Sequence, residues 1–110
     1  DMWTKGKYYF VAPASYDTKT IRKKWKKETP TLLHEFKNRL MTLSKFSSEK
    51  IESEFKSFLN EKNIGMGKLL PVLRVCITGL GMGPSLFNIA SLIGQEETIK
   101  RIENAIEKIN

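Results

Sequence analysis

The chain has 110 residues, 40% of them hydrophobic and 28% charged, which is typical of one folded domain and argues against a disordered segment. No apolar stretch approaches the ~20 residues that a membrane-spanning helix requires, no signal-peptide pattern is present, and one cysteine excludes an intramolecular disulfide. Nineteen lysines and arginines against twelve aspartates and glutamates give a net charge of +7, which favours nucleic acid as a partner ahead of an anionic membrane surface.

The N-terminal part begins with Asp1 rather than Met, so we expect the chain to be a piece of a longer protein. Residues 7–13, KYYFVAP, are aromatic and β-branched, and they predict a short strand or an extended arm. Asp17 is a candidate N-cap for a basic helix, TKTIRKKWKKE. The next helix is predicted to start at Thr29-Pro30, with Pro30 at its first position.

Two amphipathic helices are predicted next. The third helix is expected to begin at Ser47 and Ser48 and to end by Asn63, before two glycines. The apolar stripe of the second helix comprises Leu32, Leu33, Phe36, Leu40 and Leu43, and that of the third comprises Ile51, Phe55, Phe58 and Leu59.

The segment 68–78 is apolar without a clear period, and a buried strand and a buried helix containing Pro71 fit it equally well. Residues 84–93 predict a short helix that Gly94 stops. The last helix has acidic residues in its first turn and Lys108 in its last. Its apolar face comprises Ile99, Ile102, Ile106 and Ile109.

These elements predict an all-α domain of five or six short helices that covers residues 1–110. Residues 63–67 are a candidate boundary between two helical halves, 1–62 and 68–110.

Histidine and cysteine are scarce, whereas the twelve aspartates and glutamates lie on polar helix faces, where a catalytic pair of carboxylates has no positional support. His34 is the only histidine and Cys76 the only cysteine, so a metal site lacks ligands, and we expect a structural histidine near the surface and an inert buried thiol. The glycines of 79–83 match neither the dinucleotide-binding fingerprint nor a P-loop. We therefore predict no catalytic residue and no metal in this chain.

The basic segment 21–27, IRKKWKK, sets five cationic side chains around Trp25. Such a segment is typical of an RNA-binding surface, although a solvated helix face with Trp25 turned into the core is the favoured alternative for the tryptophan. The candidate phosphate contacts are Lys23, Lys24, Lys27 and Lys68.

The glycine-rich segment 79–83 leads into Pro84 and Ser85 at the start of a helix. Glycines let the backbone approach a ligand, and the free N–H groups of a helix start favour phosphate or a base acceptor. Arg74 offers a planar fork for a base edge, and an unstacked base could lie against Pro84, Leu86 or Phe87. A plain turn between helices, with Arg74 directed outward, fits this pattern as well.

A set of motifs runs through the second half of the chain: Pro71, Leu73-Arg74-Val75, Cys76, Ile77, Thr78-Gly79, Pro84-Ser85-Leu86-Phe87, Leu92-Ile93-Gly94 and Arg101. These joined motifs resemble the C-terminal region of bacterial glutamyl-tRNA synthetases. The upstream segment YYFVAPASYDTKTIRKKW also resembles that family, so the likeness covers nearly the whole chain.

The resemblance implies an all-α anticodon-binding domain of a class I aminoacyl-tRNA synthetase. Its partners would be the anticodon loop of glutamate tRNA and the rest of the synthetase chain, in a cytoplasmic monomer without a membrane partner. The parent enzyme would join glutamate to its tRNA with ATP and Mg²⁺, but the HIGH and KMSKS signatures of catalysis do not occur here, and no cofactor is expected in this piece.

The resemblance also implies which residues contact the tRNA: Arg74, Gly83, Pro84, Ser85, Leu86 and Phe87. The family often has Thr or Ser where this chain has Gly83, so only backbone groups would remain for contact there. The alternative function is a helical protein-interaction or structural module whose basic surface is incidental. A free-standing enzyme would need an activity that these residues do not suggest.

Overall fold

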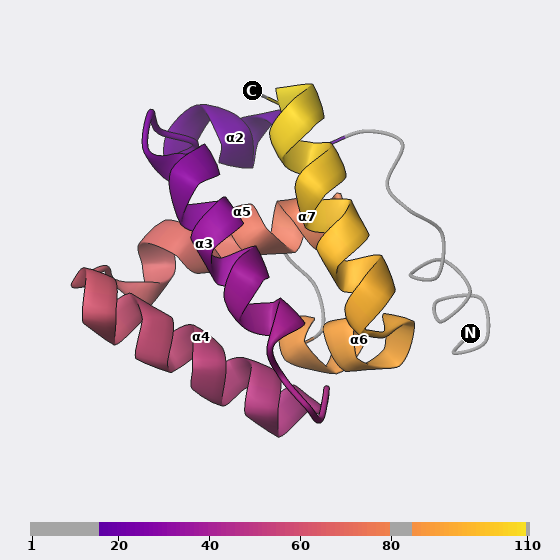
Figure 1. Cartoon of the computed structure of the whole chain (residues 1–110). Coiled ribbons are helices and arrows are strands. Elements are labelled where there is room, and N and C mark those ends of the chain that lie inside the picture. The colour runs from indigo at the N-terminus through magenta and orange to yellow at the C-terminus, as the bar shows by residue number, and fades with distance from the viewer. Residues whose placement is uncertain (1–15, 80–84, 110) are drawn as a thin grey trace.

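The computed structural model describes residues 16–79 and 85–109, and the expected arm at 7–13 lies outside them. The described residues form helices and no strand (Figure 1). Their bounds are α2 Thr18–Lys24, α3 Thr29–Met41, α4 Ser48–Lys62, α5 Met66–Thr78, α6 Leu86–Ile93 and α7 Gln95–Ile109. The predicted all-α class is confirmed.

Local capping chemistry sets the start of α2 and both ends of α4. The side chain of Asp17 accepts a 3.2 Å hydrogen bond from the N–H of Thr20 at the start of α2, and Ser47 caps α4 in the same way. Helix α4 ends at Asn63, whose backbone is left-handed with φ 57°. The predicted first position of Pro30 is wrong by one residue, because α3 already begins at Thr29.

The ambiguous segment 68–78 is part of helix α5, and Pro71 lies inside that helix. Helix α5 packs against α2 and also against α7. Because it is covered from more than one direction, its apolar residues run around most of its circumference, and this removes the 3.6-residue period that would have distinguished it from a strand.

The core is continuous across α3 to α7, on both sides of residues 63–67. At its centre the ring of Phe36 meets the ring of Phe55 edge-on, with centroids 5.2 Å apart, and lies 5.6 Å from the ring of Phe58. Phe55 also packs against Phe87 of α6 at 5.7 Å. Every residue of the two predicted stripes is buried or packs against this core, which confirms their apolar faces, although Leu43 lies beyond α3, which ends at Met41.

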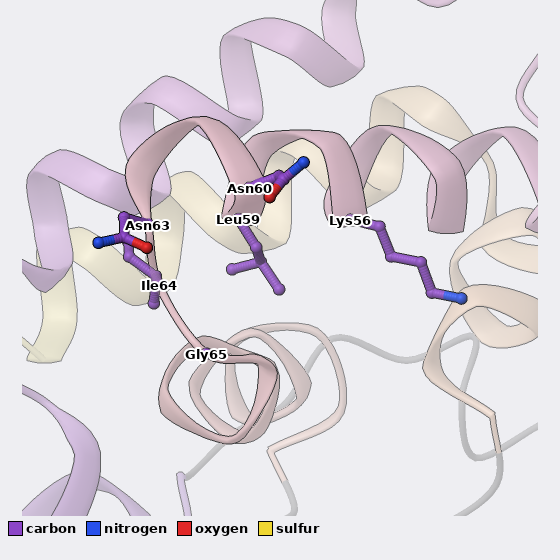
Figure 2. Close-up of a pocket in the computed structure, with 6 residues that line it drawn as sticks. All are labelled: Lys56, Leu59, Asn60, Asn63, Ile64 and Gly65. Carbon is purple, nitrogen blue, oxygen red and sulfur yellow. The ribbon is translucent and has the colours of Figure 1, made fainter.

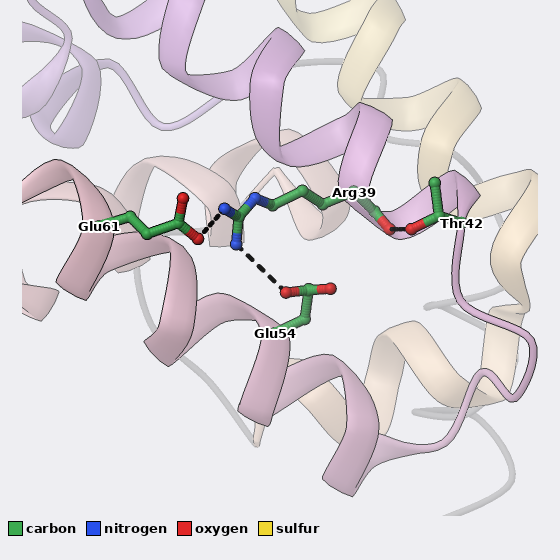
Figure 3. Close-up of polar contacts among 4 residues, drawn as sticks. All are labelled: Arg39, Thr42, Glu54 and Glu61. Atoms are coloured by element: carbon green, nitrogen blue, oxygen red, sulfur yellow. Dashed lines mark hydrogen bonds and ion pairs between the residues drawn. The ribbon is translucent and has the colours of Figure 1, made fainter.

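Polar side chains join the C-terminal half of α3 to its neighbours. The guanidinium of Arg39 forms ion pairs with Glu54, at 3.2 Å, and with Glu61, both on α4 (Figure 3). The side-chain amide of Gln95 donates hydrogen bonds to the carbonyl oxygens of Leu40 and Leu43, at 2.6 and 3.1 Å. These bonds tie the end of α3 to α4 and to the start of α7.

Candidate nucleic-acid interface

The C-terminal end of α5 is where the predicted glycine-rich segment begins. Gly79 has φ 80°, a left-handed conformation that glycine adopts without strain, and its N–H donates a 2.8 Å hydrogen bond to the carbonyl oxygen of Val75. Gly79 is thus the residue at which the helix stops. The other predicted residues of this segment, Gly81, Gly83 and Pro84, lie outside the described residues.

Arg74 lies on α5 one turn before its end. The carbonyl oxygen of Arg74 accepts a 2.9 Å hydrogen bond from the hydroxyl of Thr78, the last residue of the helix. Its side chain is half-buried. The helical form of α5 therefore places this arginine close in sequence and in space to the point where the chain leaves the helix at Gly79.

The basic segment is fixed directly to the end of α5. The backbone N–H of Asp17, the N-cap of α2, donates a 2.9 Å hydrogen bond to the carbonyl oxygen of Gly79, and α2 packs along α5 (Figure 1). Lys23 and Lys27 are exposed and Lys24 is half-buried. A cationic segment and the Arg74 end of α5 therefore lie on neighbouring helices.

Trp25, in the middle of this segment, is half-buried and packs against the core, as predicted. The basic side chains around it thus have an apolar anchor. Lys68 is exposed, and its ammonium forms a 3.3 Å ion pair with Glu28. A backbone hydrogen bond and then the Lys68 ammonium lower the pKa of the Glu28 carboxyl, so a phosphate at Lys68 would compete with an ionised carboxylate.

The start of α6 contains the three remaining candidates that the structure describes. Ser85 is exposed at the N-cap position and makes no side-chain capping bond. Leu86 and Phe87 are buried, and the ring of Phe87 packs against that of Phe55. Sequence reasoning placed Leu86 and Phe87 against a base, whereas in this structure their side chains anchor α6 in the core.

Arg101 on α7 is a residue whose place near this site the sequence did not reveal. Its side chain is 1% exposed, its Nε donates a 2.7 Å hydrogen bond to Glu97, and its Nη1 donates one of 2.9 Å to the carbonyl oxygen of Ile77 near the end of α5. The spacing of Glu97 and Arg101 on one helix predicts their pairing, but the contact with α5 depends on tertiary packing.

A pocket of about 520 Å³ lies apart from the predicted residues, between the end of α4 and the start of α5 (Figure 2). Its lining comprises Lys56, Leu59, Asn60, Asn63, Ile64 and Gly65. No predicted site residue that the structure describes is among them.

The remaining candidates for chemistry behave as structural residues. His34 is exposed, as predicted. Cys76 is buried, and burial raises the pKa of its thiol to about 12, so it is an unreactive thiol at neutral pH. Residues 16–79 and 85–109 contain no group of three or more His, Cys, Asp or Glu residues that could hold a metal ion. Within the same ranges, no helix combines the length and apolar character needed to cross a bilayer.

Comparison with known families gives this arrangement its class. The family model of the anticodon binding domain matches residues 1–106. The chain therefore belongs to the anticodon-binding domain family.

Its relatives are more specific. The chain is 37% identical over 109 residues to a glutamate–tRNA ligase of Christiangramia forsetii, covering 99% of this chain and 22% of that protein. It is 42% identical over 106 residues to the glutamate–tRNA ligase of Flavobacterium psychrophilum, covering 96% of this chain and 21% of that protein. The chain thus spans about a fifth of the length of these relatives.

A solved structure agrees with them. A crystal structure of a glutamate tRNA ligase from Elizabethkingia meningosepticum, in complex with its amino acid, superposes with a TM-score of 0.92 at 36% identity, covering 100% of this chain and 22% of that chain. The predicted fold, that of a synthetase anticodon-binding domain, is confirmed.

Proposed function

We propose that this domain recognises the anticodon loop of glutamate tRNA within a glutamate–tRNA ligase, whose other domains would join glutamate to the tRNA with ATP and Mg²⁺. The observation that carries the proposal is the hydrogen bond between Asp17 and Gly79, which fixes a basic helix beside the arginine-bearing end of α5. An RNA loop needs both a cationic surface for its phosphates and a separate group that reads its bases.

Capture of the RNA is electrostatic. Lys23, Lys24 and Lys27 extend from α2 and the residues that follow it, and their ammonium groups would contact phosphates of the loop. Lys68 would join them by exchanging Glu28 for a phosphate, because its ion pair is half-exposed and therefore weak. These contacts give affinity without reading sequence.

Reading of the bases is assigned to Arg74 and to the segment that ends at α6. The guanidinium of Arg74 can donate two parallel hydrogen bonds to a base edge. Ser85 and the first N–H groups of α6, which have no partner within their own helix, would meet a splayed base or its phosphate. Gly83 and Pro84 belong to this set by resemblance. Leu86 and Phe87 would hold the helix start in place from the core side.

A monomeric cytoplasmic ligase is the setting we propose, following the family resemblance. The competing function is a helical protein-interaction module with an incidental basic surface. The two differ in their response to salt, because binding through phosphates releases counterions and weakens steeply as salt rises, whereas an apolar interface does not.

The proposal is tested by fluorescence anisotropy with a labelled anticodon stem-loop of glutamate tRNA and a loop of scrambled anticodon, each at two salt concentrations. Two arginine variants are compared. Arg74→Ala should reduce the ratio of the dissociation constants for the scrambled and the cognate loop by ~5–100-fold, because one bidentate contact typically supplies that much discrimination. Arg22→Ala removes an exposed charge from α2 and should lower the affinity for both loops to the same extent.

Salt-sensitive binding that prefers the cognate loop and loses this preference in Arg74→Ala supports the proposal. Salt-sensitive binding with no preference would keep RNA capture but refute base reading by Arg74. A folded sample that binds neither loop at low salt would instead support the interaction module.

A further inference from the structure

Helix α7 contacts both helices that flank residues 80–84. On one side, Nη1 of Arg101 donates a 2.9 Å hydrogen bond to the carbonyl oxygen of Ile77 on α5. On the other, the hydroxyl of Thr98 donates one of 3.2 Å to the carbonyl oxygen of Ala90, in the C-terminal half of the eight-residue helix α6. Residues 98 and 101 are three apart and share one face of α7, so a single rigid helix connects the two flanks.

Both side chains are out of contact with solvent. Thr98 is 0% exposed and Arg101 is 1% exposed. A buried guanidinium with one carboxylate partner is a costly way to stabilise a fold, because an apolar side chain of similar volume often serves as well. Its Nη2 atom also donates to no residue that the structure describes. Such a group therefore suggests a role other than stability.

A hydrogen bond restricts the relative position of two helices more than an apolar contact does, because it depends on direction as well as distance. The guanidinium is held at Nε by Glu97, at 2.7 Å, so its remaining N–H groups have a fixed direction. The carbonyl that it engages lies near the C-terminal end of a helix, where the helix dipole favours a cation. The end of α5, and with it Arg74, is consequently held at one position relative to α7.

We propose that Arg101, together with Thr98, is a positioning residue for anticodon reading: the pair fixes the Arg74 end of α5 and the whole of the short helix α6 relative to α7, and thereby the place of Ser85 at the start of α6. This inference rests on the function proposed above. Neither side chain touches RNA. Their effect is to keep a base edge within reach of both flanks at once, and a displacement of ~1 Å is enough to lose most of a directional contact.

The test uses the ratio of the dissociation constants for the scrambled and the cognate stem-loop. A variant that only lowers stability reduces the folded fraction equally for both loops and leaves this ratio unchanged. Arg101→Met and Thr98→Val remove the two hydrogen bonds while keeping similar volume, and each should reduce the ratio by ~10-fold or bring it to one. Arg101→Lys keeps the charge without the fork and should recover only part of the preference.

Two matched controls accompany them. Arg39→Met removes a guanidinium that also pairs with carboxylates, but between α3 and α4, and should leave the ratio unchanged. Thr98→Ser keeps the hydroxyl and should restore the preference that Thr98→Val loses.

The outcomes separate the two proposals. If the wild-type ratio is one, base reading by this domain is refuted, and positioning with it. If the wild type prefers the cognate loop but folded Arg101→Lys and Thr98→Val keep that preference in full, only the positioning role is overturned. Should Arg101→Met fail to fold, those two variants decide the matter.

Discussion

The backbone N–H of Asp17 donates a hydrogen bond to the carbonyl oxygen of Gly79, and the side chain of the same aspartate caps α2. One residue therefore starts the basic helix and fixes that start to the end of α5. The first bond uses only backbone atoms, whereas the second depends on a side-chain oxygen. Substitution at position 17 therefore tests the cap separately from the connection between the helices.

Asp17→Ala is expected to lower the free energy of unfolding by ~1 kcal/mol, the usual effect of losing an N-cap oxygen. Urea denaturation followed by circular dichroism measures it. Asp17→Asn keeps an acceptor oxygen and should lose much less. An equal loss in both variants would show that the charge at this helix start, and not the cap, matters.

The exposed lysines of the basic segment should determine the salt dependence of RNA binding. Lys23→Gln and Lys27→Gln are each expected to reduce the slope of log affinity against log salt by about one, because each removes one phosphate contact. The controls are Lys50→Gln and Lys56→Gln, exposed on α4 at the opposite end of the molecule from α2 in Figure 1. An equal effect from both pairs would contradict a localised phosphate-binding surface.

Two glycines should respond to alanine in opposite directions. Gly94 separates α6 from α7 with φ 93° and ψ 163°, a conformation that is nearly exclusive to glycine, so Gly94→Ala should cost ~1–3 kcal/mol although no atom lies within 4 Å of an added Cβ. Gly67 lies inside α5 with the same open space, so Gly67→Ala should stabilise the protein by ~0.5–1 kcal/mol. Thermal unfolding measures the stability of both variants. A similar loss of stability in both would show that the added methyl group clashes with its surroundings, and that backbone conformation does not decide the effect.

The buried thiol of Cys76 should make stability fall at alkaline pH. Burial raises its pKa from 9.0 to about 12, so between these values the unfolded chain releases a proton that the folded chain keeps. The free energy of unfolding should therefore be unaffected by this group below pH 9 and should decrease above it, by up to ~1.4 kcal/mol per pH unit.

Urea titrations at pH 8 and pH 10.5 measure this fall, with Cys76→Ala as the control because it lacks the thiol but keeps the other alkaline titrations. Tyr16 is one of these: burial raises its pKa in both proteins, whereas the smaller rise caused by the charge of Cys76 is absent from the variant. Equal falls in the wild type and in Cys76→Ala would contradict the assignment. Native Cys76 should also resist a thiol reagent at pH 8 until the protein is unfolded.

The helices on either side of α5 were predictable because their signals are local. The apolar stripe of α4, its Ser47 cap and its end at Asn63 all come from residues within a few turns of one another. The same holds for the cap at Asp17 and the stop at Gly94. Capping and periodicity act within one helix, so the sequence contains them in full.

The candidate site was predictable only in part. Arg74 and the basic segment were identified from composition and family motifs, and Gly79 from its place after an apolar run. The burial of Leu86 and Phe87 was not predicted. The start of α6 has the same amphipathic sequence pattern whether its apolar side chains contact a base or the core.

By itself the sequence determined a basic and mainly helical domain, the capped start of α2, both ends of α4 and the family, since each rests on local pattern or on joined motifs. Only the tertiary structure decided that α5 is a helix, that Asp17 is bonded to Gly79, and that Arg101 and Thr98 connect α7 to the flanks of residues 80–84. The physical reason is that a hydrogen bond between two helices forms only where packing around the shared core brings its donor and acceptor together. Periodicity and capping act within one helix and do not determine the distance between groups on different helices.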